Sequence, residues 1–332
     1  MKTLVTGGGG FLGRYIVEAL LAKGDEVAVL CRGHYPELAR QGVRLIQADL
    51  ADRRAVMQAC EGMDQVFHVA SKTGPWGDPV AFHTTNVVGT QNVIDGCVEH
   101  GVRKLLYTSS PSAVIGFEDL AGVNERTPYP RQIVSAYQHS KMLAEQRVLA
   151  ANGHGLMTTA LRPHAIWGPR DTQLLPALIE RHRAGKLMRV GAGHNRISVS
   201  YVENAAAWHL QAAASNQVGG KVYFVNEPQP IGMWDWIDGL LTSIGLPPVK
   251  REVSYRTAYA LGAVSEAVFT ALPWLGEPRL TRAVAAVCAK DHYFDISAAQ
   301  RDFGLTSPVS MQEGQRRFAA YFAPQLQHKA IA

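Results

Sequence analysis

Cysteine is scarce in this chain, and its placement excludes two common classes of site. The 332 residues include four cysteines, none at the spacing of a zinc site or a redox pair. Cys31, Cys60 and Cys97 fall inside apolar segments, so we expect buried thiols in a reducing compartment. Histidines at metal-ligand spacing, such as a His-Glu-x-x-His motif, are also missing, and we predict no metal.

Long hydrophobic runs and blocks of basic residues are missing as well. No run reaches the roughly 18 uninterrupted apolar residues that suggest a membrane-spanning helix. No basic stretch followed by an apolar one precedes the first expected strand, as a secretion signal would require, so we expect a cytoplasmic protein. The net charge of +5 has no basic block, which argues against a nucleic-acid partner and suits an anionic small ligand.

Apolar runs that predict strands alternate with segments at helical spacing along the first half of the chain. The runs are continuous rather than alternating, which is typical of a parallel sheet covered on both faces. The pattern predicts an α/β fold, a doubly wound Rossmann sheet. We expect strands at 2–7, 26–32, 43–50, 64–71, 102–110 and 156–163, and helices at 11–24, 53–60, 78–101 and 135–153.

The alternation loosens after about residue 170, which suggests a division of the chain. We expect residues 1–170, continued by about 196–226, to form the dinucleotide-binding domain. Residues 171–195 and 227–332 then form a smaller substrate-binding region, helix-rich from residue 255.

A glycine run follows the first expected strand and opens the first helix, in the stretch TGGGGFLG. Two registers of a dinucleotide motif fit, one with Gly8, Gly10 and Gly13 and one with Gly7, Gly10 and Gly13. In both, the turn lets a pyrophosphate approach the backbone, and the helix N-terminus supplies free N–H groups. We therefore expect the cofactor to contact the Gly7, Gly10 and Gly13 register together with Phe11 and Leu12.

The end of the second expected strand bears on which dinucleotide binds. An NAD site usually has an acidic residue there, but this strand ends in Arg32, which could meet a 2′-phosphate, with Arg14 as a second cation. We predict NADP(H) and leave NAD(H) open. Asp49 and Leu50, after the third strand, are expected beside the adenine.

Tyr137 and Lys141 stand four residues apart on an expected helix and therefore share one face. The fifth expected strand ends in hydroxyl residues, Thr108 to Ser110, and ligands bind at strand carboxyl ends in such sheets. Ketone reduction needs a proton donor at the oxygen, which Tyr137 can be. We expect the Lys141 ammonium to lower the pKa of Tyr137 and to hold ribose hydroxyls, while a serine hydroxyl stabilises the developing charge.

The glycine run, YTSS, the Tyr137/Lys141 pair and LRPHAIWGP together resemble the extended short-chain dehydrogenase/reductase superfamily over nearly the whole chain. The resemblance implies Ser110 as the catalytic serine, with Ser109 as the alternative. We also expect Ser109, Tyr137 and Lys141 to contact the cofactor. It also implies cofactor contacts at Ala70, within HVAS, at Asn86 and at Pro163. We include Lys72 among the expected cofactor contacts. It is also a candidate, with Arg196, for a substrate carboxylate.

Several stretches resemble the 3β-hydroxysteroid dehydrogenase-like branch, among them LRP…IWGP and ASKTGPWGD. VFHVASKTGPWG and YTSSPSAV resemble the bacterial 2-alkyl-3-oxoalkanoate reductases of long-chain olefin biosynthesis. That resemblance implies NADPH-dependent reduction of the 3-keto group of a long-chain 2-alkyl-3-oxoalkanoic acid. A 3β-hydroxysteroid or sterol dehydrogenase, a nucleotide-sugar epimerase and a non-catalytic dinucleotide sensor stay open as alternatives.

An apolar keto acid or ketone needs an apolar wall, for which Trp76, Ile166 and Trp167 are candidates. Leu261, Val264, Val268 and Leu272 share one face of an expected tail helix. That face is expected to be core or dimer surface, a lid, a partner surface or a peripheral membrane contact. The resemblance implies a homodimer and allows a complex with other olefin-pathway enzymes. We expect structural, hydrogen-bonded roles for His68, His83 and His164.

Overall fold

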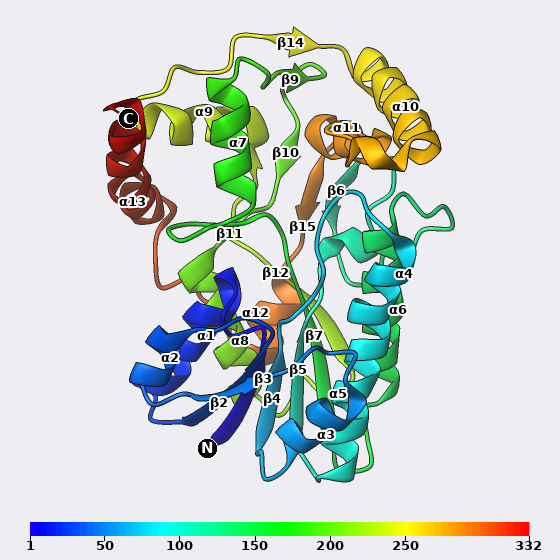
Figure 1. Cartoon of the computed structure of the whole chain (residues 1–332), viewed down its shortest axis with the longest axis vertical. Coiled ribbons are helices and arrows are strands. Elements are labelled where there is room, and N and C mark those ends of the chain that lie inside the picture. Colours follow the sequence, from blue (N-terminus) through cyan, green and yellow to red (C-terminus); the bar gives the residue numbers. More distant parts are fainter. Residues whose placement is uncertain (332) are drawn as a thin grey trace.

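A parallel sheet of seven strands lies at the centre of the protein (Figure 1). The computed structural model describes residues 1–331, with side chains through residue 326. The strand order is β12-β7-β5-β4-β1-β2-β3, so the order reverses beside β1. This confirms the prediction of a doubly wound α/β fold. The strands are β1 (Lys2–Thr6), β2 (Glu26–Cys31), β3 (Arg44–Gln47), β4 (Gln65–His68), β5 (Lys104–Thr108), β7 (Met157–Pro163) and β12 (Lys221–Val225).

Helices cover both faces of this sheet, and that is why its strands are continuously apolar. Leu4 and Val5 are neighbours in β1, and both are fully buried, yet they belong to different hydrophobic cores because successive side chains point to opposite faces. One core includes α1 (Phe11–Ala22) and α8 (Val202–Ala214), while the other includes α3 (Arg53–Cys60), α5 (Gly89–Glu99) and α6 (Ala136–Ala150). The short α2 (Pro36–Arg40) follows β2.

The long helix expected over 78–101 has an irregular centre. Asp78 caps its first turn by accepting a hydrogen bond from the Val80 N–H. The chain then passes from α4 (Pro79–Phe82) through a π-helical segment, His83–Val88, into α5. Such π-helical turns are frequent at functional sites, and this one contains Asn86.

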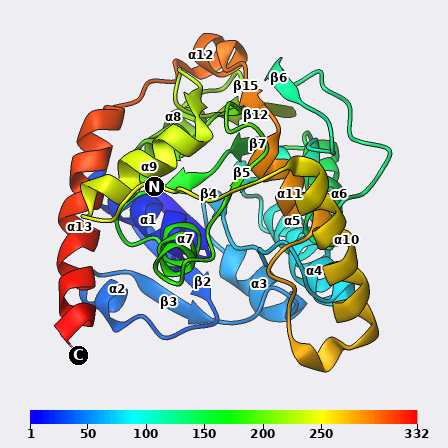
Figure 2. The same ribbon diagram turned by 90° about the horizontal axis from the view of Figure 1, so that it is seen from above.

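A smaller region lies across one end of the sheet (Figures 1 and 2). Its four-stranded sheet has the order β13-β10-β15-β6, and two of these strands come from segments assigned by sequence to the Rossmann domain. The strands are β6 (Leu120–Val123), β10 (Arg196–Ile197), β13 (Ile231–Gly232) and β15 (His292–Phe294), with the parallel pairs β8 (Ile166–Trp167) to β11 (Ser200–Tyr201) and β9 (Arg189–Val190) to β14 (Glu252–Val253). The helices are α7 (Leu174–Arg183), α9 (Met233–Ser243), α10 (Tyr255–Ala271), α11 (Arg282–Ala289) and α13 (Met311–Ile331), while α12 (Ser297–Phe303) packs against β12 and α8.

Helix α10 packs on α11 through a glycine. It does not pack there through the apolar face that was predicted for this helix from the sequence. A Cβ at Gly262 would lie 2.7 Å from the Arg282 backbone nitrogen, so only glycine allows this approach. Leu261, Val264 and Val268 point outward and are exposed. The prediction that this apolar face belongs to the hydrophobic core is therefore wrong. Across residues 1–331, no helix combines the length and apolarity needed to cross a membrane.

Candidate active site

The glycine turn between β1 and α1 is shaped by close packing. A Cβ at Gly13 would lie 2.2 Å from the Gly7 carbonyl oxygen, and Gly7 adopts the left-handed region at φ +71°. Gly8 instead packs on Val29, where a Cβ would lie 2.5 Å from a methyl carbon. Of the two registers, Gly7, Gly10 and Gly13 are the glycines that line the adjoining cavity.

The N-terminus of α1 faces that cavity with unpaired backbone groups. Gly10 is the N-cap residue and has no side chain to cap the helix. In the described turn, the N–H groups of Phe11, Leu12 and Gly13 find no backbone acceptor. Free N–H groups at a helix N-terminus favour a phosphate, so this turn fits the pyrophosphate of a dinucleotide.

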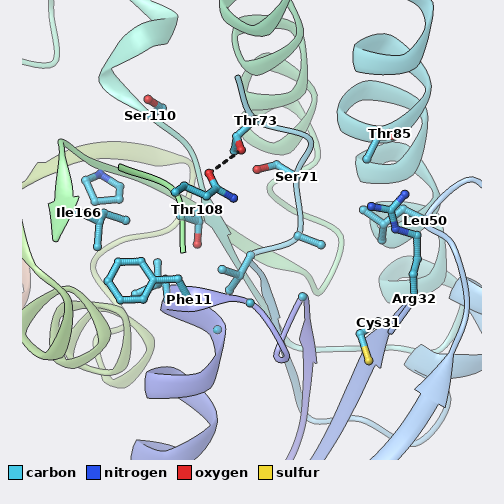
Figure 3. A pocket seen from close by; sticks show the side chains of 18 of the residues that line it. Phe11, Cys31, Arg32, Leu50, Ser71, Thr73, Thr85, Thr108, Ser110 and Ile166 are labelled. Carbon is cyan, nitrogen blue, oxygen red and sulfur yellow. Dashed lines mark hydrogen bonds between the residues drawn. The ribbon is translucent and has the colours of Figure 1, made fainter. Parts of the chain in front are cut away.

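The cavity extends across the carboxyl ends of the central strands (Figure 3). Its volume of about 530 Å³ is within the usual range for small-molecule sites. In this view Ser110 and Phe11 lie on the left and Arg32 on the right, at the opposite end. Residues predicted to bind the cofactor that line it are Gly7, Gly10, Phe11, Leu12, Gly13, Arg32, Asp49, Leu50, Ala70, Ser109, Tyr137, Lys141 and Pro163.

At the Arg32 end of the cavity, the arginine side chain is exposed to solvent and makes only a long ion pair. The side chain of Arg32 is 77% exposed, and its Nη1 lies 3.6 Å from Asp49 Oδ2. Asp49 also accepts a hydrogen bond from the Ala51 N–H, which holds its carboxylate after β3. Arg14 is engaged elsewhere, because it donates to the Gly9 carbonyl and pairs with Glu37. Of the two arginines, Arg32 is the cation available to a ligand.

The opposite end brings together Tyr137, Lys141 and the serines after β5. Lys141 is buried, donates to the Thr108 carbonyl at 2.7 Å, and lies 4.3 Å from the centre of the Tyr107 ring. The hydroxyl of Ser110 accepts from the Ser112 N–H. The first turns of α6 and the end of β5 thus place a phenol, an amine and a hydroxyl on one cavity wall.

Burial shifts the pKa values of both groups on α6. It raises the pKa of the Tyr137 phenol, although hydrogen bonding to Ser110 and Ser112 acts in the opposite direction. Burial also lowers the pKa of Lys141 to about 7, with the Glu145 carboxylate opposing the shift. The expected lowering of the Tyr137 pKa by the Lys141 ammonium is therefore not found in the protein alone, because desolvation dominates. A raised pKa keeps the phenol protonated, which suits a proton donor.

Ser109, the alternative to Ser110, is bound into a buried network. Its hydroxyl donates to Glu145 Oε2 at 2.6 Å, and Glu145 forms two hydrogen bonds with Arg162, at 2.5 and 2.9 Å. Glu145 and Arg162 are almost fully buried. Because the hydroxyl hydrogen of Ser109 is used in this network, Ser110 is the better placed serine.

Asn86 shapes the cavity wall indirectly. Its Oδ1 accepts from the Lys72 N–H at 2.7 Å, and its Nδ2 donates to the Lys72 carbonyl and to Ser140 Oγ, both at 2.9 Å. Asn86 is buried and fixes the main chain after β4. Neither Asn86 nor Lys72 lines the nucleotide cavity. The Lys72 ammonium lies instead 5.2 Å from the centre of the Phe82 ring. The structure therefore does not place Lys72 in the cavity where the cofactor is expected.

Several substrate-side expectations need correction. Trp167 is fully buried in the core of the smaller region, against Tyr201 and Trp236, so it is not a substrate wall. Arg196 is exposed on β10 and stacks on Tyr293, away from the cavity. Ile166 does line the cavity, and Trp76 lines a second one.

Two of the three histidines have the expected structural role. His68 is bonded to Thr6 Oγ1 and Thr90 Oγ1, and His164 to the Ser198 carbonyl. Burial lowers the pKa of His68 to about 3 and that of His164 to about 4. His83 is exposed on the π-helical segment, so the structural interpretation is wrong for this residue.

Residues after β4 and before α7 that the sequence did not single out also line the cavity. Thr73 Oγ1 donates to Gln173 Oε1 at 3.0 Å across the cavity, a bond drawn from Thr73 in Figure 3. Asp171 accepts from three N–H groups at the start of α7 and so fixes the cavity-lining Gln173 and Leu174. An Asp before a helix is the only sequence signal here, and it indicates a cap rather than a site.

Comparison with known proteins shows which family and which enzymes this chain is similar to. Residues 4–254 match the model of the 3-beta hydroxysteroid dehydrogenase/isomerase family. The 2-alkyl-3-oxoalkanoate reductase of Stenotrophomonas maltophilia is 44% identical, over 96% of this chain and 99% of that protein. The sterol-4-alpha-carboxylate 3-dehydrogenase (decarboxylating) of Mus musculus is 33% identical, over 97% of this chain and 91% of that protein.

A solved structure shares the fold at lower identity. The dTDP-glucose 4,6-dehydratase DesIV from Streptomyces venezuelae, solved as a double mutant with NAD bound, superposes with a TM-score of 0.77 and 22% identity. The match covers 97% of each chain. At this identity the likeness shows the Rossmann fold alone.

Proposed function

This chain belongs to the 3-beta hydroxysteroid dehydrogenase/isomerase family and is an NAD(P)-dependent oxidoreductase, and we propose that it uses NADPH to reduce the 3-keto group of a long-chain 2-alkyl-3-oxoalkanoic acid. The observation that carries the proposal is the wall formed by Tyr137, Lys141 and Ser110 at one end of the dinucleotide-shaped cavity. The 44% identity to a reductase of that name supports the substrate class.

The residues of the site can perform the proton chemistry of this reaction. When bound, the reduced dinucleotide supplies a hydride to the carbonyl carbon. The Tyr137 hydroxyl donates a proton to the keto oxygen, so the ketone gains a hydride and a proton and becomes the alcohol. Ser110 donates a hydrogen bond to the same oxygen and stabilises its developing charge. Lys141, buried beside them, would bind the ribose hydroxyls of the dinucleotide.

The preference for NADPH is proposed from the open end of the cavity. The chain places Arg32 at the end of β2, where a carboxylate would bind the 2′-hydroxyl of NAD. Because the Arg32 guanidinium is exposed and only loosely paired with Asp49, it is available to a 2′-phosphate. Arginine is well suited to bidentate phosphate contacts.

A sterol-type carboxylate dehydrogenase is the second candidate, favoured by the 33% identity to such an enzyme. The names of both relatives describe a carboxylate on the carbon next to the reacting one. The shared chemistry is thus a 3-hydroxy or 3-keto acid with an apolar body. A homodimer through α5 and α6, a complex with olefin-pathway enzymes, a membrane contact and a cytoplasmic location stay predictions.

The test is a comparison of substrates on the purified protein. Because 3-keto acids decarboxylate readily, we would follow NADP⁺ reduction with long-chain 2-alkyl-3-hydroxyalkanoic acids and with a 3β-hydroxysterol 4-carboxylic acid. We expect turnover of the first and little of the second. Turnover of the sterol acid alone would replace the proposal by the second candidate, and turnover of neither would overturn both.

A further inference from the structure

A second cavity, of about 1120 Å³, lies between α10, the 75–79 loop and the segment 134–136 before Tyr137. We infer that this cavity, named here the α10 groove, binds an alkyl chain of the keto acid, with Lys72 near its inner end as the partner of the carboxylate. The inference rests on the proposed function and names the part of the protein that selects its substrate.

The α10 groove adjoins the catalytic wall at two points. Ser135 and Ala136 line the groove and directly precede Tyr137 in the chain. On the loop side, a Cβ at Gly77 would lie 3.2 Å from the Phe82 ring, and the centre of that ring is 6.2 Å from the centre of the Tyr137 ring. The buried Phe82 ring therefore lies between this part of the groove and Tyr137, and the inferred path of the alkyl chain runs past it.

The groove is apolar enough for a hydrocarbon chain. Its apolar lining includes Pro75, Trp76, Val134, Ala263, Ala267 and Phe269. Two of its charged residues neutralise each other, because Glu266 accepts from both the backbone N–H and the Nε of Arg282 at 2.7 Å. Asp78 is used as the cap of α4. Glu277 also lines the groove, near Gly77, so it is the apolar part of the wall that is suited to contacts with methylene groups.

Lys72 places a cation beside Phe82, the ring that separates the groove from Tyr137. Its ammonium lies over the same Phe82 ring that packs against Tyr137. In a 2-alkyl-3-oxo acid, carbon 2 carries both the carboxylate and the alkyl branch, so the two leave the reacting centre together. A cation one ring away from Tyr137 matches that arrangement. Asn86 holds the Lys72 main chain, which leaves the side chain free for this contact.

Helix α10 offers a matched pair of positions one turn apart, of which one lines the groove and the other does not. Ala267 lines the groove, so a larger side chain there fills the groove without displacing packed core. Val264 points outward and is 62% exposed. Ala267→Trp therefore narrows the groove, while Val264→Trp adds the same bulk to the same helix outside it.

The experiment compares chain lengths in both variants. Oxidation with NADP⁺ is measured for 2-methyl-3-hydroxybutanoic acid and for its analogue with two long alkyl chains. We expect Ala267→Trp to lower kcat/KM for the long substrate by about tenfold or more, since each buried methylene contributes to binding. The short substrate should change by less than about twofold, and Val264→Trp should resemble the wild type. Lys72→Met should raise KM about tenfold for the free acid but not for its methyl ester.

The outcomes separate this inference from the proposed function. Equal losses on both substrates, or no loss on either, in an Ala267→Trp protein with wild-type unfolding temperature and NADPH affinity would overturn the groove assignment. Equal changes of KM for the free acid and its methyl ester in Lys72→Met would overturn the assignment of Lys72 to the carboxylate. If the wild type turned over no hydroxy acid, the proposed function would fail on its own. Binding of a fluorescent long-chain fatty acid, weakened by Ala267→Trp and not by Val264→Trp, would then still support the groove, and equal binding by the two variants would overturn it.

Discussion

The nucleotide cavity is lined by Tyr137 and the α10 groove by the two residues before it, yet the two are built in different ways. The nucleotide cavity is formed by strand ends and a glycine turn, so its shape follows from the backbone of the sheet. The α10 groove is formed by a loop and by a helix outside the sheet, and small side chains on α10 leave its space open. The first region fixes the chemistry, and the second region can change its substrate without disturbing that chemistry.

The largest expected effect comes from Tyr137, which lines the nucleotide cavity and directly follows two residues of the groove. Tyr137→Phe removes the proton donor, and loss of a positioned acid lowers kcat by about 10²- to 10⁴-fold. Because the hydroxyl acts at the keto group, the loss should be the same for short and long substrates, unlike the loss in Ala267→Trp. Steady-state kinetics with both substrates measure this, with Tyr321→Phe on the surface of α13 as the control.

A chain-length-dependent loss in Tyr137→Phe would break the comparison, because it would place Tyr137 in the groove rather than at the reacting atoms. Retained activity would remove the catalytic assignment and leave the fold unaffected. Unfolding temperature and NADPH affinity should match the wild type, since the phenyl ring still packs against Phe82.

The second prediction concerns the far end of the nucleotide cavity. Arg32→Ala should lower kcat/KM for NADPH by about 10- to 100-fold, the effect of losing hydrogen bonds to a charged group. The value for NADH should not fall, because NADH has no 2′-phosphate. Arg103→Ala is the matched control, since Arg103 is also exposed and paired with an aspartate, Asp64. Equal losses with both cofactors would contradict the NADPH preference.

The same contrast explains how much the sequence could predict. The fold and the line of residues from Gly7 to Pro163 follow from local signals, a glycine turn after a strand and polar residues at strand ends. The groove has no such signal, because it depends on α10 returning from more than a hundred residues along the chain. Hydropathy alone cannot separate Trp167, which is core, from Trp76, which lines a cavity.

The sequence indicates which positions lie near the cofactor site better than it indicates which side chains line that site. Asn86 was expected at the cofactor, and the structure shows why the position is special: its side chain fixes the main chain of Lys72. The π-helical segment that carries it cannot be read from helical periodicity. Lys72 illustrates the same limit, since its ammonium lies beside Phe82 rather than in the nucleotide cavity.

The smallest expected effect compares two buried histidines, one in the central sheet and one in the four-stranded sheet of the smaller region. Burial lowers the pKa of both to about 3. His68 in β4 has both ring nitrogens hydrogen-bonded, whereas both ring nitrogens of His292 in β15 lack a protein partner among the described residues. His68→Leu should lower the free energy of unfolding by about 1–3 kcal/mol, because Thr6 and Thr90 lose their partner, while His292→Leu should be nearly neutral.

The two histidines should nevertheless respond alike to acid. Between pH 6.5 and about 3 the unfolded chain binds a proton at each histidine that the folded chain does not. Stability therefore falls as the pH falls, by at most about 1.4 kcal/mol per pH unit for each residue. Urea unfolding at pH 7 and pH 5 should show each leucine variant less sensitive to acid than the wild type. Both histidines are buried, but only His68 is hydrogen-bonded in the part of the chain that the structure describes. Equal destabilisation of the two leucine variants at pH 7 would therefore mean that His292 is as well bonded in solution as His68.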